Sequence, residues 1–138
     1  MFLVRQAADV IDRDVMILPG ETSLDEFVRL PQHEGRVRHV VVIRDDKVVG
    51  AVRINTELHH GLEGTYTGVS LEDVASRNFI FAQPDEIMFG VIGRMWKAGA
   101  MMTVVSQGNG VARADQVLGV ITKEHVADSV AASVQPYR

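Results

Sequence analysis

The sequence predicts an α+β fold made of two similar repeats, each with the element order β-α-β-β-α. Two observations predict it. The pattern Asp9-Val10, then Arg13 to Ile17, reappears at an offset of 64 positions as Asp73-Val74, then Arg77 to Phe81. In each copy, β-branched runs alternate with stretches whose apolar residues recur at helical spacing. An internal repeat of this kind indicates a doubled fold, because each copy is one supersecondary unit.

The first copy carries signals for one helix start and one hairpin. Ser23-Leu24-Asp25-Glu26 is typical of a capping box, in which a hydroxyl and a carboxylate satisfy free amides at a helix start. Arg44-Asp45-Asp46-Lys47 separates two β-branched runs, which indicates a hairpin turn. The expected elements are a strand from Val15 to Leu18, a helix from Leu24 that stops before Pro31, strands from His39 to Ile43 and from Val48 to Val52, and a short helix from about Ile54 to His59.

The second copy contains a longer amphipathic helix. We expect Asp85 to cap this helix and its single apolar stripe to face the core. The last helix repeats its apolar face every four residues, at Val126, Val130 and Val134. The stripe of the longer helix consists of Met88, Val91, Ile92, Met95 and Trp96. We expect strands near Phe79, from about Met101 to Val105 and from Gln116 to Ile121, and we expect the last helix to begin at Thr122.

The repeat divides the chain into a first repeat over residues 1–60, a linker over 61–70 and a second repeat over 71–138. Three glycines among polar residues between Gly61 and Gly68 favour a linker there. With 138 residues, of which 46% are apolar and 23% charged, the chain is expected to be folded nearly throughout.

The composition argues against several classes of function. A net charge of -4 without a basic stripe argues against binding to nucleic-acid polymers. The absence of cysteine excludes disulfides, thiolate metal sites and cysteine nucleophiles. No apolar run approaches the ~20 residues of a membrane-spanning helix, and the first residues lack a secretory signal, so we expect a cytoplasmic location. No metal site is predicted, because the adjacent His59 and His60 diverge on a helix.

One segment of the second copy resembles a family signature. Leu118-Gly119-Val120-Ile121-Thr122-Lys123-Glu124-His125 resembles the Gly-apolar-apolar-Thr-x-x-Asp signature of the CBS (cystathionine-β-synthase) family, with His at the Asp position. The matching segment of the first copy, Val49 to Thr56, keeps the glycine and the strand. With its doubled layout, the chain resembles a tandem CBS pair, or Bateman module, whose repeats pack with pseudo-twofold symmetry. Gly119 to Val134 with Pro136-Tyr137 is also similar to the end of the cytoplasmic CBS pair of bacterial ClC-type chloride channels and transporters.

The resemblance implies a ligand site in a cleft between the repeats. In this family the cleft often binds adenosine nucleotides, which makes ATP, ADP or AMP the possible ligands and leaves no firm cofactor. The signature Thr usually contacts phosphate, and the signature Asp holds the ribose hydroxyls. A threonine at a helix start also lies near the positive end of the helix dipole, which favours an anion. The implied ligand residues are Thr122 and His125 from the second repeat, and Ile17, Gly35, Arg36 and Val37 from the first.

The same symmetry implies a second, pseudo-equivalent cleft. Arg53 takes the place of the phosphate-binding Thr and Thr56 that of the ribose-binding Asp, with Ala100 and Met101 across the cleft. Neither signature position is kept in this copy, so we expect a weaker site.

Three hypotheses for the function remain open. The first is an allosteric sensor, a homodimer formed through its helices, in which a nucleotide biases an attached membrane transport domain; the chain would then be the cytosolic part of an inner-membrane protein. The second is a structural dimerisation module whose clefts are filled by side chains. The third is a small enzyme with His125 or His39 as general base; the sequence shows no oriented partner for either, so no catalytic residue is predicted.

Overall fold

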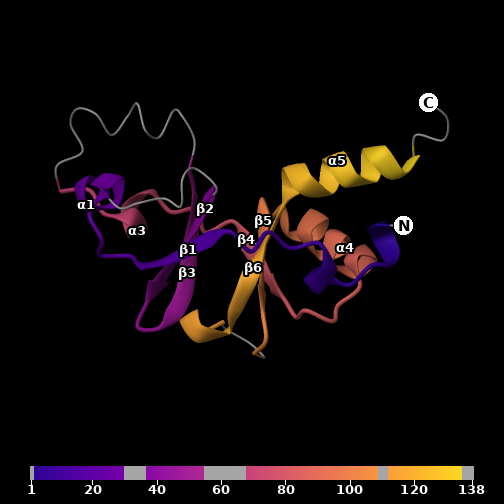
Figure 1. The fold of residues 1–138 in the computed structure, drawn as a ribbon, viewed down its shortest axis with the longest axis horizontal. Helices are drawn as coiled ribbons and strands as arrows, with labels where there is room; N and C mark the ends of the chain where they lie inside the picture. Colours follow the sequence, from indigo (N-terminus) through magenta and orange to yellow (C-terminus); the bar gives the residue numbers. More distant parts are fainter. Residues whose placement is uncertain (1, 30–36, 55–67, 109–111, 135–138) are drawn as a thin grey trace. The chain divides into compact units, whose positions relative to one another are not determined.

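The computed structural model describes residues 2–29, 37–54, 68–108 and 112–134. The fold is α+β, as predicted: two three-stranded sheets, ordered β1-β2-β3 and β4-β5-β6, each combine one parallel and one antiparallel pair (Figure 1). The chain forms two compact units. One comprises Asp14–Arg77, called the 14–77 unit below; the other comprises Asn78–Arg138 together with Met1–Arg13, called the 78–138 unit.

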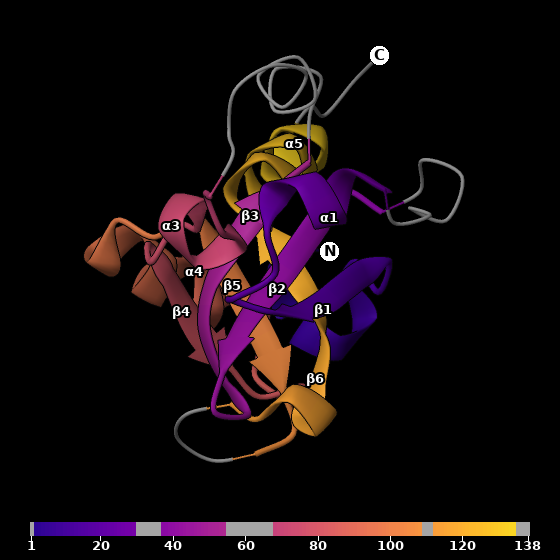
Figure 2. The same cartoon turned by 90° about the vertical axis from the view of Figure 1, so that its left-hand side faces the viewer.

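In the 14–77 unit, two short helices cover one face of the first sheet (Figure 2). The buried cluster under them joins Leu24 and Phe27 of the first helix, Leu71 of the second, and Val40 and Val42 of the central strand. These side chains are 0–1% exposed, so apolar burial holds the unit together. The elements are β1 (Val15–Pro19), α1 (Leu24–Arg29), β2 (His39–Arg44), β3 (Lys47–Arg53) and α3 (Leu71–Val74).

The turn between β2 and β3 confirms the predicted hairpin. Asp45 and Asp46 adopt φ angles of 51° and 65°, the left-handed conformation that a two-residue type I′ turn requires at both central positions. Aspartate tolerates this conformation better than most residues because its short side chain makes local hydrogen bonds. The predicted helix start is also found, since the amide of Glu26 donates to Ser23 Oγ at 3.1 Å.

In the 78–138 unit, two longer helices and the N-terminal turns gather on one face of the second sheet (Figure 1). Met88, Val91 and Met95 of the first helix are buried against Val105 and Ile121 of the sheet. The elements are η1 (Phe2–Val4), η2 (Ala7–Asp9), β4 (Phe79–Ala82), α4 (Met88–Ala98), β5 (Met102–Ser106), η4 (Ala114–Gln116), β6 (Val117–Thr122) and α5 (Lys123–Val134).

The residues before each sheet pair with the last strand of the opposite sheet. Asp12, which leads into β1, forms an antiparallel bridge with Val120 of β6, whereas Ser76, which leads into β4, forms one with Ala51 of β3. The 64-residue offset that relates the two copies in sequence carries Asp12 onto Ser76. The repeat found in the sequence is therefore also a repeat of backbone pairing.

The glycine kept in both copies is explained by these bridges. A Cβ at Gly50 would lie 2.8 Å from the Cβ of Ala75, and one at Gly119 would overlap the carbonyl oxygen of Asp12. Separations under 3 Å essentially never occur for real Cβ atoms, so a side chain at either position would push the bridged segment away.

Two sequence expectations about α4 are wrong. Asp85 does not cap the helix: Ile87 is the N-cap and provides no side-chain hydrogen bond. Instead, Glu86 accepts a hydrogen bond from the amide of Gln83 at 2.6 Å and pairs with Arg94 at 2.6 Å. These two bonds fix the turn before α4 and tie it to the second helical turn.

The second correction concerns Trp96, which is 83% exposed and does not belong to the core. The rest of the predicted stripe is correct: Met88, Val91 and Met95 are buried, and Ile92 packs against the cluster. The error arises because a stripe wide enough to include Trp96 extends past the edge of the helix face that meets the sheet.

Several short elements were not predicted from the sequence. Helix α3 begins with a complete capping box, in which Ser70 and Asp73 each accept from the other's amide, at 3.3 and 2.9 Å. The turns η1 and η2 were also not predicted. The helix predicted over 54–59 lies outside the described residues from 55 onward, as does most of the predicted linker.

The repeat boundaries predicted from sequence, 1–60, 61–70 and 71–138, remain a prediction about homology. The division of the chain by spatial contacts differs from these repeat boundaries, because residues 1–13 pack with the 78–138 unit.

No helix in the described part of the chain is long and apolar enough to cross a membrane.

Candidate functional site

Thr122 lies at the junction between the last strand and the last helix. It is the final residue of β6, opposite Met102 of β5, and it is half-buried. Its Oγ1 accepts a hydrogen bond from the amide of His125 at 3.1 Å, which makes Thr122 the cap of α5. A hydroxyl that accepts one bond still has its own hydrogen to donate. The residue can therefore donate to an oxyanion at the positive end of the helix.

His125 occupies the first turn of α5 and is exposed. Its ring meets that of Phe2 edge to face, with centroids 6.0 Å apart and an interplanar angle of 64°. A neutral imidazole has one acceptor nitrogen, whereas a carboxylate has two acceptor oxygens. His125 is thus held beside Thr122 by an aromatic contact, but it cannot clamp two neighbouring hydroxyls as an aspartate does.

Two residues assigned to the second predicted cleft, Ala100 and Met101, lie between the end of α4 and β5, and Met101 contacts the start of α5. The carbonyl of Met101 accepts from the amide of Lys123 at 3.0 Å, and the Met101 side chain is 47% exposed. Ala100, the preceding residue, is buried, and its amide donates to Met95. The structure therefore places Met101 next to Thr122, and both belong to the 78–138 unit.

The other predicted site residues belong to the 14–77 unit. Ile17 is half-buried on β1, opposite Val41. Val37 is 4% exposed just before β2, and Arg53 is exposed at the end of β3. The amide of Ile54 donates to the Arg38 carbonyl at 2.7 Å, which holds the end of β3 beside the residues that enter β2.

Gly35, Arg36 and Thr56 lie outside the described residues. Among the residues that are described, the structure groups Thr122, His125 and Met101 in one unit, and pairs Arg53 with His39 in the other. The predicted combinations that take residues from both units stay a prediction.

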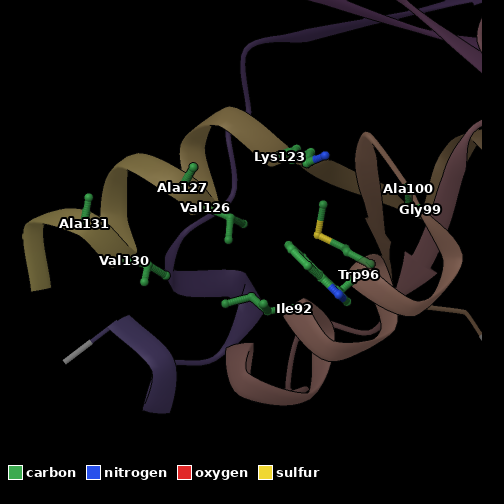
Figure 3. Close-up of a pocket in the computed structure, with 10 residues that line it drawn as sticks. Ile92, Trp96, Gly99, Ala100, Lys123, Val126, Ala127, Val130 and Ala131 are labelled. Carbon is green, nitrogen blue, oxygen red and sulfur yellow. The ribbon is translucent and has the colours of Figure 1, made fainter. Parts of the chain in front are cut away.

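An apolar groove between α4 and α5 was not predicted. It has a volume of about 610 Å³, and Figure 3 shows Val126 and Val130 of α5 pointing toward Ile92 of α4. Ala127 and Ala131 of α5 also line the groove. Trp96 contributes its exposed indole and Lys123 lies at one end of the groove (Figure 3).

The outer side of α4 next to this groove is unusual for a helix surface. Phe89 is 71% exposed, and Trp96, seven residues further along the helix, is 83% exposed. Gly90 lies in the first turn of α4, and Gly93 lies further inside the helix, where glycine is less favourable than alanine by roughly 1 kcal/mol. A Cβ at either position would meet nothing within 4 Å. The spacing of Phe89 and Trp96 in the sequence could have revealed this face, because residues seven apart share one side of a helix.

A smaller, polar hollow of about 400 Å³ lies on the 14–77 unit beside the β2–β3 turn. Arg44 and Glu72, which help to line it, form an ion pair at 3.2 Å. Within the described ranges, no group of three or more His, Asp or Glu side chains is placed to hold a metal ion.

Comparison with protein families finds one match: residues 7–55 match the CBS domain. No curated protein matches this chain. Solved structures match over nearly the whole chain. A crystal structure of an uncharacterized conserved protein from Pyrococcus horikoshii is 21% identical, with a TM-score of 0.62, covering 100% of this chain and 98% of the other.

Two further structures carry bound adenosine compounds. The CBS domain pair of protein MJ0100, in complex with 5′-methylthioadenosine and S-adenosyl-L-methionine, is 18% identical, with a TM-score of 0.64, covering 94% of this chain and 98% of the other. The CBS domain of a bacterial CNNM/CorC family Mg²⁺ transporter, in complex with ATP, is 17% identical, with a TM-score of 0.64, covering 91% and 87%. The fold of this chain is thus that of a CBS domain pair.

Proposed function

We propose that this chain is a regulatory CBS pair that binds an adenosine nucleotide at Thr122 and transmits that binding to an attached membrane ion-transport domain. The observation that carries the proposal is the placement of Thr122, which caps α5 while keeping a hydroxyl hydrogen to donate. Two proteins of the same fold are solved with adenosine compounds bound, which supports this choice of ligand class.

A phosphate group is the part of the ligand that Thr122 suits best. The hydroxyl lies at the N-terminus of a 12-residue helix, whose dipole favours an anion there. Lys123, the next residue, is exposed at the same helix start and adds a positive charge. A phosphate would therefore meet one donor, one cation and the positive end of the helix dipole.

The ribose end of the ligand is expected to be held more weakly. His125 stands where the CBS signature has Asp, and its imidazole accepts one hydrogen bond rather than two. We propose that Ile17, Gly35, Arg36 and Val37 contribute the remaining contacts. The second proposed site, with Arg53, Thr56, Ala100 and Met101, is weaker because Arg53 supplies no hydroxyl at the phosphate position.

An attached ion-transport domain is the partner that the comparisons favour. One protein of the same fold is the CBS domain of a bacterial Mg²⁺ transporter, and the sequence itself resembles the CBS pair of ClC-type chloride channels. Attachment to a chloride channel or transporter rests on that sequence resemblance alone. In either case the module would lie on the cytosolic side of an inner membrane and would have no catalytic role.

A second candidate function is dimerisation, which the surface of α4 favours. An exposed apolar face on a helix that contains two glycines is suited to close approach by another surface. We propose that a second copy of this chain covers Phe89 and Trp96 and fills the groove between α4 and α5. The two candidate functions are compatible, but a module that only dimerises would bind no nucleotide.

A thermal-shift titration with AMP, ADP, ATP and S-adenosylmethionine separates the two candidates. A ligand that binds the native state must raise its apparent stability, by about 2.7 kcal/mol at a free concentration of 100 Kd. A saturable rise with at least one nucleotide supports the sensor. If none of the four compounds moves the transition at millimolar concentration, while the protein sediments as a dimer, the scaffold is correct instead.

A further inference from the structure

We infer that residues 2–12 form part of the Thr122 site, with Phe2 as a positioning residue for His125. The segment is called seated when it makes its contacts with α4, β6 and His125, and nucleotide binding and the seated state then favour one another. The inference rests on the proposed function, since it concerns the same nucleotide. Three contacts carry it, at the start, the middle and the end of the segment.

The start of the segment contacts His125 directly. Phe2 is 9% exposed and belongs to the buried cluster of the 78–138 unit, in contrast to Val4 of the same turn, which is 65% exposed. The Phe2 ring meets the His125 ring edge to face at 6.0 Å. Because Phe2 is fixed by the core, it restricts where the imidazole can lie.

The middle of the segment is bonded to the start of α4. The carbonyl of Arg5 accepts from the amide of Met88 at 2.8 Å, and the amide of Ala7 donates to the carbonyl of Glu86 at 2.8 Å. The two bonds join the segment to Glu86 and Met88, the residues on either side of Ile87. They therefore fix the position of residues 5–7 relative to the start of α4.

The end of the segment is bonded to β6, close to Thr122. Asp12 and Val120 exchange two backbone hydrogen bonds, at 2.8 and 3.0 Å. Val120 precedes Thr122 by two residues, whereas His125 follows it by three. The one segment therefore holds the polypeptide on both sides of the residue proposed to bind phosphate.

This arrangement makes the coupling reciprocal. Seating of the segment fixes the strand before Thr122 and the imidazole after it, so the seated state binds the nucleotide more tightly. Linkage then requires that the nucleotide favour the seated state by the same factor. Phe2 acts only through His125 and need not touch the nucleotide.

Hydrogen–deuterium exchange of the N-terminal segment tests the inference, with AMP as the probe and AMP affinity measured by calorimetry on the same samples. If unseating abolishes binding, AMP slows exchange within residues 5–12 by a factor that reaches about a hundred at 100 Kd. Amides of β3 provide the internal reference for general stabilisation.

Phe2→Leu and Val4→Ala are the matched variants. Phe2→Leu keeps an apolar side chain in the core but lacks the aromatic edge, and it should weaken AMP binding about tenfold. It should also move the NMR signals of the His125 ring, because the ring current of Phe2 is lost. Val4→Ala, at the exposed position of the same turn, should change neither.

The failures are distinguishable. AMP binding without slowed exchange of residues 5–12, or wild-type affinity in Phe2→Leu, overturns the inference and leaves the proposed function intact. Absence of binding of AMP, ADP and ATP alike by the wild-type chain overturns both.

Discussion

Asp12 and Val120 form a reciprocal backbone pair, in which each amide donates to the other residue's carbonyl, at 2.8 and 3.0 Å. Ser76 and Ala51 form the equivalent pair, at 2.8 and 3.0 Å. In both cases the residues that lead into one sheet are hydrogen-bonded to the last strand of the other. Gly119 precedes Val120 and Gly50 precedes Ala51, so each glycine lies beside one of these bridges. Neither position has room for a Cβ, which explains why both copies have glycine there.

Replacing Gly119 by Ala should destabilise the fold. The new Cβ would overlap the Asp12 carbonyl, and relief requires displacement of the bridged segment, so we expect a loss of about 1–3 kcal/mol in the free energy of unfolding. Chemical denaturation measures it. Gly90→Ala is the control of opposite sign, because a Cβ there meets nothing and alanine favours the helix by up to about 1 kcal/mol. A Gly119→Ala protein as stable as wild type would refute the close approach.

Replacing Thr103 by Val should stabilise the fold. Thr103 is fully buried on β5, and its hydroxyl has no hydrogen-bond partner among the described residues. Valine has a similar shape without the polar atom, so the free energy of unfolding should rise by about 1 kcal/mol. Thr103→Ala leaves a cavity and should lower it. A loss of stability in the valine variant would show that the hydroxyl is satisfied in solution.

Replacing Trp96 by Glu should weaken the proposed dimer. The indole is 83% exposed beside the apolar groove, and a carboxylate buried there in a dimer would be unpaired. Sedimentation equilibrium should show a dimer dissociation constant at least tenfold higher than that of wild type. Val4→Glu is the control, since Val4 is also exposed but lies on η1. A wild-type chain that stays monomeric at high micromolar concentration would contradict the dimer.

Replacing Gly93 by Ala should move monomer stability and dimer affinity in opposite directions. Alanine favours the helix by roughly 1 kcal/mol, and a Cβ at this position would meet nothing within 4 Å. If another surface approaches α4 closely, the added methyl obstructs it. Denaturation at low protein concentration and sedimentation at high concentration measure the two effects. Unchanged association would place the interface away from Gly93.

The sequence was informative where local chemistry decides the structure. The Asp45-Asp46 turn and the Ser23 cap are set by neighbouring residues, and both were predicted correctly. Asp85 was misassigned because Glu86, the next residue, accepts the hydrogen bond from Gln83 and pairs with Arg94. The sequence offered two acids in succession, and only the fold decides between them.

Part of the site was also beyond reach of the sequence. Thr122 was predicted as a ligand residue from its signature; the structure shows it at the cap of α5, and its role in binding stays a prediction. The contact between Phe2 and His125 joins residues at opposite ends of the chain, and no local pattern predicts such a pair. The grouping of residues 1–13 with the second sheet was missed for the same reason.

The central claim is that the Thr122 hydroxyl binds the phosphate of an adenosine nucleotide, and isothermal titration of AMP into three proteins tests it most directly. Wild type and Thr122→Ser, which keeps the hydroxyl, should bind with similar affinity. Thr122→Ala should bind about ten- to a hundredfold more weakly, as expected for a lost hydrogen bond to a charged group of about 1.5–3 kcal/mol. Equal affinity of Thr122→Ala and wild type would contradict the account, as would a failure of all three proteins to bind AMP, ADP or ATP.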